Sequence, residues 1–511
     1  MRSFPKESQS YDYIIIGAGS AGSVIAHRLS SMNVGRIGLL ECGSRSSSRM
    51  IRRPAVYANL FSNPRYSYCD LSTPQTNLAQ RRILLPSGKG LGGSSLINGM
   101  ILMPPHPSDL SRLSSIVGDT LDSDWSEIER RITDHYDLPP RQPLHAASEW
   151  FHSQLCPAEA HYVFPFRRTQ REGKRTSVWD AFMRTQNHSN LSLYSDCTVD
   201  SLLFDGDQAS GVIARRGMTK VAMKAAHGVI VCCGALKSPM LLMASGIGSQ
   251  DMLQQAGILC RFDSPNVGRN LHDHLVFPVI FETPIDALTT PFSAADQQQW
   301  QTTGLGPVSS NIAELGAFFC NSNGQLKWTD HSQQTSAQPT FQWHVTPTHY
   351  LEYPLRSKSK HSMSIGVTCL HPKSRGDIQL QPNGSFLINP NYLSQSQDTS
   401  DLVEAVDWTR RWLHSNLASV PEFHEQLPGR KRDSLASLRS AVEKYASTLF
   451  HYGGTCSVGQ ENDSVCDPSF RVRGVRGLYV CDASSLPTTL SGNTQLTVMM
   501  LAWRFCDLLQ S

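Results

Sequence analysis

Residues 11–22 read Tyr11-Asp-Tyr-Ile-Ile-Ile-Gly-Ala-Gly-Ser-Ala-Gly22, and this segment is the strongest indication of the fold. Its first part is an isoleucine-rich run that is too short for a helix, which predicts a buried strand. From residue 24 onward, apolar residues recur at helical spacing. The segment therefore predicts a strand and a helix joined by a glycine-rich turn of the form G-x-G-x-x-G.

This turn is typical of dinucleotide-binding sites. Gly17 allows the tight turn, Gly19 lets a pyrophosphate approach the backbone, and Gly22 lets helix and strand pack closely. The helix begins with Ser20 and Ala21. The N-terminus of such a helix supplies amide donors and a partial positive charge to a pyrophosphate.

An acidic residue follows at the position where such sites bind the ribose. The second predicted strand, residues 36–40, ends at Glu41. A carboxylate there can accept hydrogen bonds from the hydroxyls of an adenosine ribose. It argues against a 2′-phosphate, and so against NADP, but it leaves both NAD and FAD open.

The composition excludes several classes of protein. The 511 residues correspond to roughly three domains of about 150 residues. A formal net charge of +3, without long runs of one sign, argues against a nucleic-acid or membrane-surface binder. We find no run of the ~18–20 apolar residues that a membrane span needs and no signal peptide. The 13 scattered cysteines predict neither a disulfide framework nor a metal site, so we expect a cytoplasmic protein.

Two further glycine-containing segments, residues 87–99 and 234–248, are too specific to arise by chance. With them, the chain resembles the glucose–methanol–choline (GMC) oxidoreductase family from Tyr11 to the C-terminus. Supporting stretches are residues 266–274, 372–376 and 451–509. The chain looks most similar to choline dehydrogenase-like and hydroxymethylfurfural oxidase-like members. The resemblance implies FAD as cofactor and oxidation of an alcohol carbon by hydride transfer to the flavin.

The resemblance implies the fold, and a change of composition over residues 286–440, where Gln, Ser, Thr and aromatic residues dominate, indicates a second, inserted domain. We expect an α/β protein with a Rossmann-like FAD-binding domain and an inserted α+β substrate-binding domain. The FAD-binding domain would comprise residues 1–145, 191–285 and 441–511, and the substrate-binding domain residues 146–190 and 286–440. Within the FAD-binding domain, residues 190–211 read as two strands joined by the turn Asp205-Gly206.

Further FAD contacts are implied by carrying the family's positions over to this chain. Beyond the first glycine turn and Glu41, they are Gly93, Asn98, Gly99, Val199, Asp482, Ala483, Thr494 and Gln495. Ile97 stands where some members have a histidine that binds FAD covalently, so we expect non-covalent binding at this position. Residues 102–107 depart from the family pattern, and Asp109 is the one residue retained beyond them, which leaves open what covers the flavin.

The resemblance assigns the catalytic base to His451. This residue stands in His-Tyr-Gly-Gly-Thr, which matches the family's His-x-x-Gly-Thr motif. An imidazole with a pKa near ~6.5 is suited to taking a hydroxyl proton at neutral pH. Asn493 occupies the place of the base's partner, and its uncharged amide can donate a hydrogen bond to a developing alkoxide.

Candidate substrate contacts come from the predicted inserted domain. They are Glu314, Trp343, His344, His349 and Tyr350. A quaternary ammonium substrate such as choline would need an aromatic cage together with a carboxylate. The sequence does not establish that these residues converge, so choline is one possible substrate among other alcohols.

We therefore predict oxidation of a small alcohol, most simply a primary alcohol, to an aldehyde. O2 and another electron acceptor both remain open, as does the oligomeric state. The main alternative is a flavin-containing lyase that cleaves cyanohydrins, although such members typically pair two histidines where this chain has His451 and Asn493. A light-driven flavin decarboxylase and a non-catalytic binding protein are further alternatives that no sequence feature favours.

Overall fold

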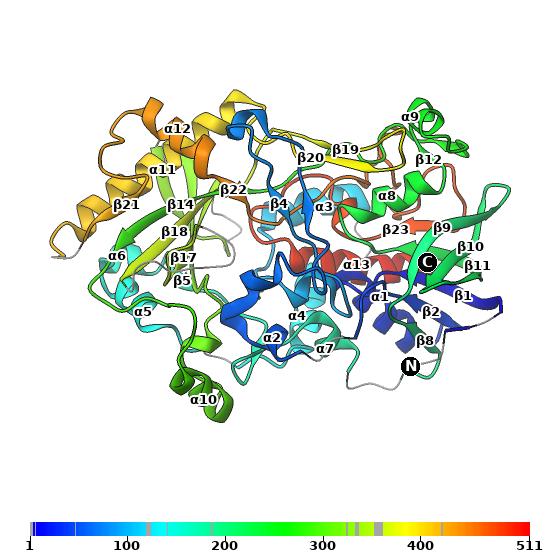
Figure 1. The fold of residues 1–511 in the computed structure, drawn as a ribbon, viewed down its shortest axis with the longest axis horizontal. Coiled ribbons are helices and arrows are strands. Elements are labelled where there is room, and N and C mark those ends of the chain that lie inside the picture. Colours follow the sequence, from blue (N-terminus) through cyan, green and yellow to red (C-terminus); the bar gives the residue numbers. More distant parts are fainter. Residues whose placement is uncertain are drawn as a thin grey trace.

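The computed structural model describes residues 4–5, 7–45, 48–118, 124–139, 142–184, 188–322, 325–332, 337–351, 361–420 and 423–510. Two large sheets organise these residues, one on the right of Figure 1 and the other on the left. The chain passes between the two sheets several times, so each contains strands from distant parts of the sequence. The α/β fold predicted from the sequence is confirmed.

The first sheet has a parallel core. Its order is β8 (Leu191–Tyr194), β2 (Ile37–Leu40), β1 (Gln9–Ile16), β11 (Thr219–Val231) and β23 (Leu478–Val480). Helices α1 (Ser20–Ser31) and α13 (Gln495–Gln510) pack against each other beside this sheet. Every residue of β2 is buried, as expected for an apolar strand covered on both faces.

An antiparallel extension continues from β11. Its first half pairs with β10 (Gln208–Arg216), which pairs in turn with β9 (Thr198–Asp205). The turn Asp205-Gly206 joins β9 to β10 as predicted, and Gly206 adopts a φ of +59°. Residues 190–211 are not simply two strands, however. Residues 191–194 form β8, which pairs with β2 in the parallel part of the sheet.

The second sheet is antiparallel and follows the order β16–β15–β17–β18–β14–β21, with β5 and β22 at its margins. Strands β17 and β18 are buried along their whole length. Helix α11 (Ser396–Leu417) packs against β18 and β14. The strands are β5 (Phe164–Pro165), β14 (Leu275–Glu282), β15 (Leu315–Ser322), β16 (Gln325–Thr329), β17 (Phe341–Thr346), β18 (Ser362–Cys369), β21 (Glu425–Leu427) and β22 (Ser447–Thr448).

The strand pairing changes two of the expected domain boundaries. Strand β14 pairs with β18 along its whole length, although the sequence analysis assigned residues 191–285 to the FAD-binding domain. Strand β22 also pairs with β14, although residues 441–511 were assigned to the same domain. Composition does not change at these points, because apolar strands of either sheet look alike in sequence. The partner strand, distant along the chain, determines which sheet they join.

Shorter elements connect and flank the two sheets. The remaining helices are α2 (Arg49–Arg52), α3 (Pro107–Val117), α4 (Trp125–Asp134), α5 (Ala146–Ser153), α6 (Pro157–Ala160), α7 (Val178–Phe182), α8 (Lys237–Ala244), α9 (Gln250–Gln255), α10 (Ala294–Thr303) and α12 (Leu435–Tyr445). The remaining strands are β3 (Asp70–Leu71), β4 (Leu84–Leu85), β6 (Gln170–Arg171), β7 (Lys174–Arg175), β12 (Ile247–Gly248), β13 (Phe262–Asp263), β19 (Asp377–Leu380) and β20 (Phe386–Asn389).

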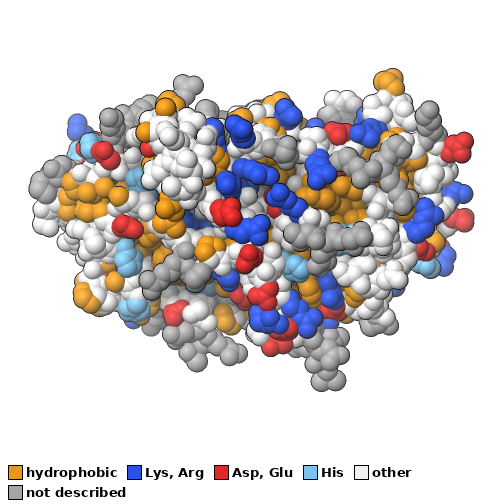
Figure 2. Space-filling model, turned by 90° about the horizontal axis from the view of Figure 1, so that it is seen from below, with side chains coloured by type: hydrophobic (Ala, Val, Ile, Leu, Met, Phe, Trp, Pro, Cys, Tyr) orange, Lys and Arg blue, Asp and Glu red, His pale blue; other side chains and the backbone are white. Residues whose placement is uncertain are grey.

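The surface carries charges of both signs. On the face shown in Figure 2, basic and acidic side chains are interspersed, with apolar patches between them. Within the described ranges, no helix combines the length and apolar character that crossing a bilayer requires.

Candidate active site and cofactor cavity

A cavity of about 520 Å³ is lined by residues from both sheets. This volume falls in the range of about 300–1,000 Å³ that is usual for small-molecule sites. Residues of the first glycine turn line it together with His344 of β17 and His451 near β22. The two sheets therefore enclose one shared site.

The first two glycine-rich segments meet at the cavity. Gly93 adopts a φ of +52°, and a Cβ atom placed on it would lie 2.6 Å from the Cα of Gly19. Gly17 has a φ of +100°, and its Cβ would lie 2.4 Å from the carbonyl oxygen of Cys232. Gly22 packs against the Gly17 carbonyl instead of lining the cavity, as expected for the third glycine.

Glu41 ties the two glycine-rich segments together. Its carboxylate accepts hydrogen bonds from the amides of Ala18 at 2.9 Å, Gly43 at 2.8 Å and Gly90 at 3.0 Å. Burial raises the pKa of Glu41, and these amide donors oppose the increase. The side chain lines the cavity, so it also stands where a ribose contact is expected.

Asp482 performs a similar role for the third glycine-containing segment. One carboxylate oxygen accepts from the Gly234 amide at 2.8 Å and the Ser238 hydroxyl at 2.5 Å. The other accepts from the amide of Ser484 at 2.7 Å. The end of β23 is thereby joined to the segment that leads into α8, and both line the cavity.

The structure brings together nearly all residues predicted for the site. Apart from Gly22, the cavity is lined by Gly17, Gly19, Ser20, Ala21, Glu41, Gly93, Asn98, Gly99, Val199, His451, Asp482, Ala483, Asn493, Thr494 and Gln495. Ile97 also lines it and carries no group that could bond covalently to a cofactor. These positions agree with the expected cofactor site, while the role of each residue stays a prediction.

The substrate candidates divide into two groups. His344 and Tyr350 line the cavity, whereas Glu314, Trp343 and His349 do not. The Glu314 carboxylate instead accepts from the Ser310 hydroxyl at 2.6 Å and the His145 amide at 2.8 Å. Trp343 belongs to a cluster of tryptophans, Trp328, Trp408 and Trp412, that packs between the sheet and α11. An aromatic cage built on Glu314 and Trp343 is therefore excluded.

His451 lies between two polar partners. Its Nδ1 is 2.8 Å from Nδ1 of His274, and its Nε2 is 3.2 Å from the amide nitrogen of Asn493. The Nε2 of His274 is 2.9 Å from the carbonyl oxygen of Leu370. A carbonyl can only accept, so this Nε2 carries the proton of neutral His274. The proton between the two Nδ1 atoms then belongs to His451, whose Nε2 keeps its lone pair.

The surroundings keep both imidazoles uncharged. Burial lowers the pKa of His451 well below its usual value, and His274 and His344 lower it further. Burial likewise lowers the pKa of His274 to about 3. Burial also lowers the pKa of His344 to about 4, although the neighbouring Asn493 side chain opposes this shift. His451 is therefore a free base at neutral pH.

A buried aspartate holds the backbone of both histidines. The Asp273 carboxylate accepts from the amides of His451 and His274, each at 2.8 Å. It also accepts from the hydroxyls of Tyr392 at 2.6 Å and Thr448 at 2.5 Å. Residues 266–274 match the family pattern in sequence, but that match alone assigns them no role. Two histidines flanking an aspartate in that segment were the available signal.

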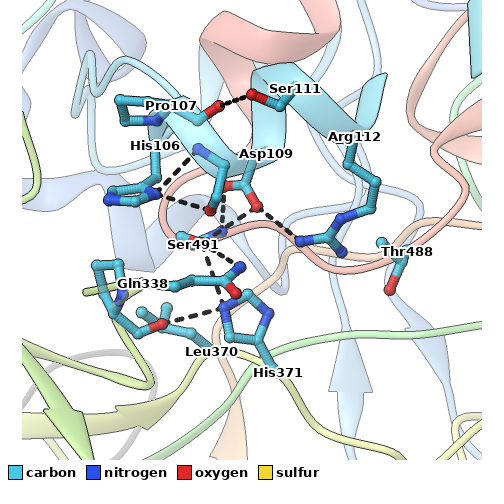
Figure 3. A network of polar contacts seen from close by, with 12 residues as sticks. His106, Pro107, Asp109, Ser111, Arg112, Gln338, Leu370, His371, Thr488 and Ser491 are labelled. Atoms are coloured by element: carbon cyan, nitrogen blue, oxygen red, sulfur yellow. Dashed lines mark hydrogen bonds and ion pairs between the residues drawn. The ribbon is translucent and has the colours of Figure 1, made fainter. Parts of the chain in front are cut away.

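The segment that carries Asn493 is anchored by a second polar network (Figure 3). Asp109 of α3 accepts from the amide of Ser491 at 2.7 Å and from its hydroxyl at 3.1 Å. The Nε2 of His331 is 2.9 Å from the Ser491 carbonyl oxygen. Residues 102–107, which depart from the family pattern, thus lead into the helix whose Asp109 fixes the backbone two residues before Asn493.

Comparison with known proteins establishes the family. The N- and C-terminal profiles described as GMC oxidoreductase match residues 11–276 and 372–502. The chain belongs to the GMC oxidoreductase family. The resemblance seen in the sequence is thereby confirmed.

Relatives and solved structures match along nearly the whole chain. An alcohol dehydrogenase [acceptor] from Pseudomonas putida is 30% identical, with 96% of this chain and 94% of the relative covered. An oxygen-dependent choline dehydrogenase from Ectopseudomonas mendocina is also 30% identical, covering 98% and 94%. The crystal structure of pyridoxine 4-oxidase from Mesorbium loti aligns with a TM-score of 0.83 at 25% identity, covering 97% of this chain and 98% of that one.

Proposed function

We propose that this GMC oxidoreductase uses FAD to oxidise a primary alcohol to an aldehyde. The observation that carries the proposal is a neutral imidazole, His451, whose Nε2 keeps its lone pair beside the Asn493 amide in the shared cavity. The names of the relatives, an alcohol dehydrogenase and a choline dehydrogenase among them, support the substrate class.

The residues around the cavity fit FAD. The turn from Gly17 to Gly22 would hold the pyrophosphate, Glu41 the adenosine ribose, and the backbone of Val199 the adenine. The isoalloxazine ring would lie along Gly93, Asn98, Gly99, Asp482, Ala483, Thr494 and Gln495. Gln495 supports this placement, because its amide nitrogen is buried at the cavity and has no hydrogen-bond partner among the residues that the structure describes. Bound FAD would supply the hydride acceptor.

His451 and Asn493 would have different roles in oxidising the alcohol. His451 takes the hydroxyl proton on Nε2, while its own Nδ1 proton stays on the side of His274. The amide of Asn493 donates to the substrate oxygen as negative charge develops there, and it remains uncharged throughout. His344 lines the same cavity and can hydrogen-bond the rest of the substrate.

Anaerobic flavin reduction tests the proposal. The purified protein is loaded with FAD and titrated without oxygen with a panel of aliphatic and aromatic primary alcohols, and flavin bleaching is recorded. We expect His451→Ala to retain FAD and to reduce it about 10²–10⁴-fold more slowly, since the general base is lost.

The control is His414→Ala, because His414 lies in α11 and contacts Glu425 rather than the cavity. It should reduce FAD at the wild-type rate. Wild-type reduction by His451→Ala would overturn the assignment of the base. If no alcohol bleached the flavin and the protein released cyanide from a cyanohydrin, the lyase alternative would replace the proposal. His274 does not favour that alternative, since it is absent from the cavity lining.

A further inference from the structure

Arg175 is a buried cation close to the cavity, and no acidic side chain of the described ranges pairs with it. Its guanidinium donates to the carbonyl oxygens of Ile51 at 3.1 Å and Ser95 at 3.0 Å. It also donates to both the side-chain and the backbone oxygen of Asn98, each at 2.7 Å. The residue is only 4% exposed.

Two of the other buried arginines, in contrast, lie beside a carboxylate. Arg410 pairs with Glu425 at 2.9 Å, and Arg168 faces Glu314 at 3.8 Å. No carboxylate of the described residues forms an ion pair with Arg175, whose acceptors are all neutral. Burying an unpaired charge is costly, so a position that keeps one calls for a compensating negative charge nearby.

A chain of hydrogen bonds leads from Arg175 into the cavity. Arg175 donates to the amide oxygen of Asn98, and the amide nitrogen of Asn98 donates to the side-chain oxygen of Gln495 at 2.6 Å. The amide nitrogen of Gln495 is buried and has no partner within the described part of the chain. All these bonds run in one direction, so the guanidinium polarises each amide in turn, and linked hydrogen bonds strengthen one another.

We infer that Arg175 is a positioning residue that acts through Asn98 and Gln495 to present a polarised donor to the negative charge that FAD gains on reduction. The inference rests on the proposed function, since it requires FAD in the cavity. Its consequence is thermodynamic: the network should favour reduced over oxidised FAD. A purely structural role, in which Arg175 only ties together the backbone at Ile51, Ser95 and Asn98, would not affect that balance.

The test measures flavin properties instead of turnover. Wild type, Arg175→Met, Gln495→Leu and the double variant are loaded with FAD. Their midpoint potential is measured against reference dyes, and their affinity for sulfite, which forms an anionic flavin adduct, is measured by absorbance. Each single variant should favour reduced FAD at least tenfold less, which corresponds to a potential about 30 mV lower for a two-electron couple. Sulfite should bind more weakly by a similar factor.

The double variant and two controls separate this role from a structural one. Because Arg175 acts only through the Gln495 donor, the double variant should shift the potential no further than Gln495→Leu alone. Arg175→Lys, which keeps the charge, should recover part of the shift. Arg410→Met, which disrupts a buried arginine far from the chain of hydrogen bonds, should leave the potential unchanged even if it destabilises the fold.

Each outcome bears on one of the two proposals. If wild type binds FAD and alcohols reduce it, but Gln495→Leu leaves potential and sulfite affinity unchanged, the inference is overturned while the proposed function stands. Additive shifts in the double variant would also overturn it. If wild type takes up no FAD, the proposed function itself fails. Should Arg175→Met not fold, Gln495→Leu alone carries the test.

Discussion

The imidazole proposed as the catalytic base owes its protonation state to neighbours that do not line the cavity. The Leu370 carbonyl sets the tautomer of His274, and His274 sets that of His451. Without this order, the proton of neutral His451 could sit on Nε2 and leave no base facing the cavity. The Asp273 carboxylate accepts four hydrogen bonds, and two of them, from the backbone amides of His274 and His451, hold the two histidines in place relative to each other.

We predict that His274→Phe slows flavin reduction by about 10–100-fold, because the Nδ1 proton of His451 loses its acceptor and the tautomer is no longer fixed. Anaerobic single-turnover reduction measures the rate, and FAD affinity should stay within about twofold of wild type, since His274 does not line the cavity. His274→Gln offers an acceptor oxygen at the same place and should recover part of the rate. Equal rates for the Phe and Gln variants would contradict the role assigned to His274.

The elements that build the cavity approach one another through glycine. The turn between β1 and α1 approaches the segment around Gly93 so closely that a Cβ atom on Gly93 would collide with the backbone of Gly19. Helix α13 begins at Gln495, two residues after Asn493, and α3 anchors that segment through Asp109. The site is therefore held by contacts between elements, and none of the elements could form it alone.

We predict that Gly93→Ala weakens FAD binding more than tenfold, because its Cβ would displace the Gly19 backbone from the place where the pyrophosphate is expected. Gly206→Ala is the matched control: Gly206 has a φ of +59°, close to the +52° of Gly93, but no heavy atom of the described residues beyond its chain neighbours lies within 4 Å of its Cβ position. Both variants should lose about 1 kcal/mol of stability from the left-handed backbone. Equal FAD affinity in the two variants, measured by fluorescence titration, would disprove the steric argument.

The molecule as a whole buries many histidines in neutral form. Burial lowers the pKa of several of them to about 3 or 4, and that of His451 well below its usual value. The histidines whose pKa is lowered to about 3 or 4 are His27, His272, His274, His331, His344 and His371. In the unfolded chain these groups take up protons near pH 6.5, but in the folded protein they do so only at lower pH. Below pH 6.5, proton uptake therefore favours the unfolded chain. The free energy of unfolding has its full value above pH 6.5 and decreases as the pH falls below it.

We predict that the melting temperature falls by several degrees between pH 7.5 and pH 6, since each such histidine loses on the order of 0.5–1 kcal/mol over this range. Buried carboxyl groups act in the opposite direction, but the pKa of Asp273 is raised only to about 6, so its effect begins at the end of the window. Thermal unfolding followed by circular dichroism measures the trend. His27→Phe should flatten the curve, and the exposed control His227→Phe should not. A constant or rising melting temperature would refute the argument.

Local patterns in the sequence were sufficient for the parts of this protein that depend on short stretches of backbone. The G-x-G-x-x-G turn, the strand–helix alternation around it and the His-x-x-Gly-Thr motif each require particular residue types within a few positions, so they are visible without a structure. They correctly indicated the α/β fold and the family, and they singled out His451, which lines the cavity. The residues that contact that histidine were not visible in these patterns.

Contacts between distant residues became known from the folded chain alone. His274 meets His451 across 177 positions, and Asp109 meets Ser491 across 382. Strand β14 joins the second sheet because of its partner β18, and Glu314 is withdrawn from the substrate by its own buried partners. Such pairings depend on how whole elements pack, because the energy of burying an apolar strand or a polar side chain is set by what lies opposite it in space, and a local pattern carries no record of that partner.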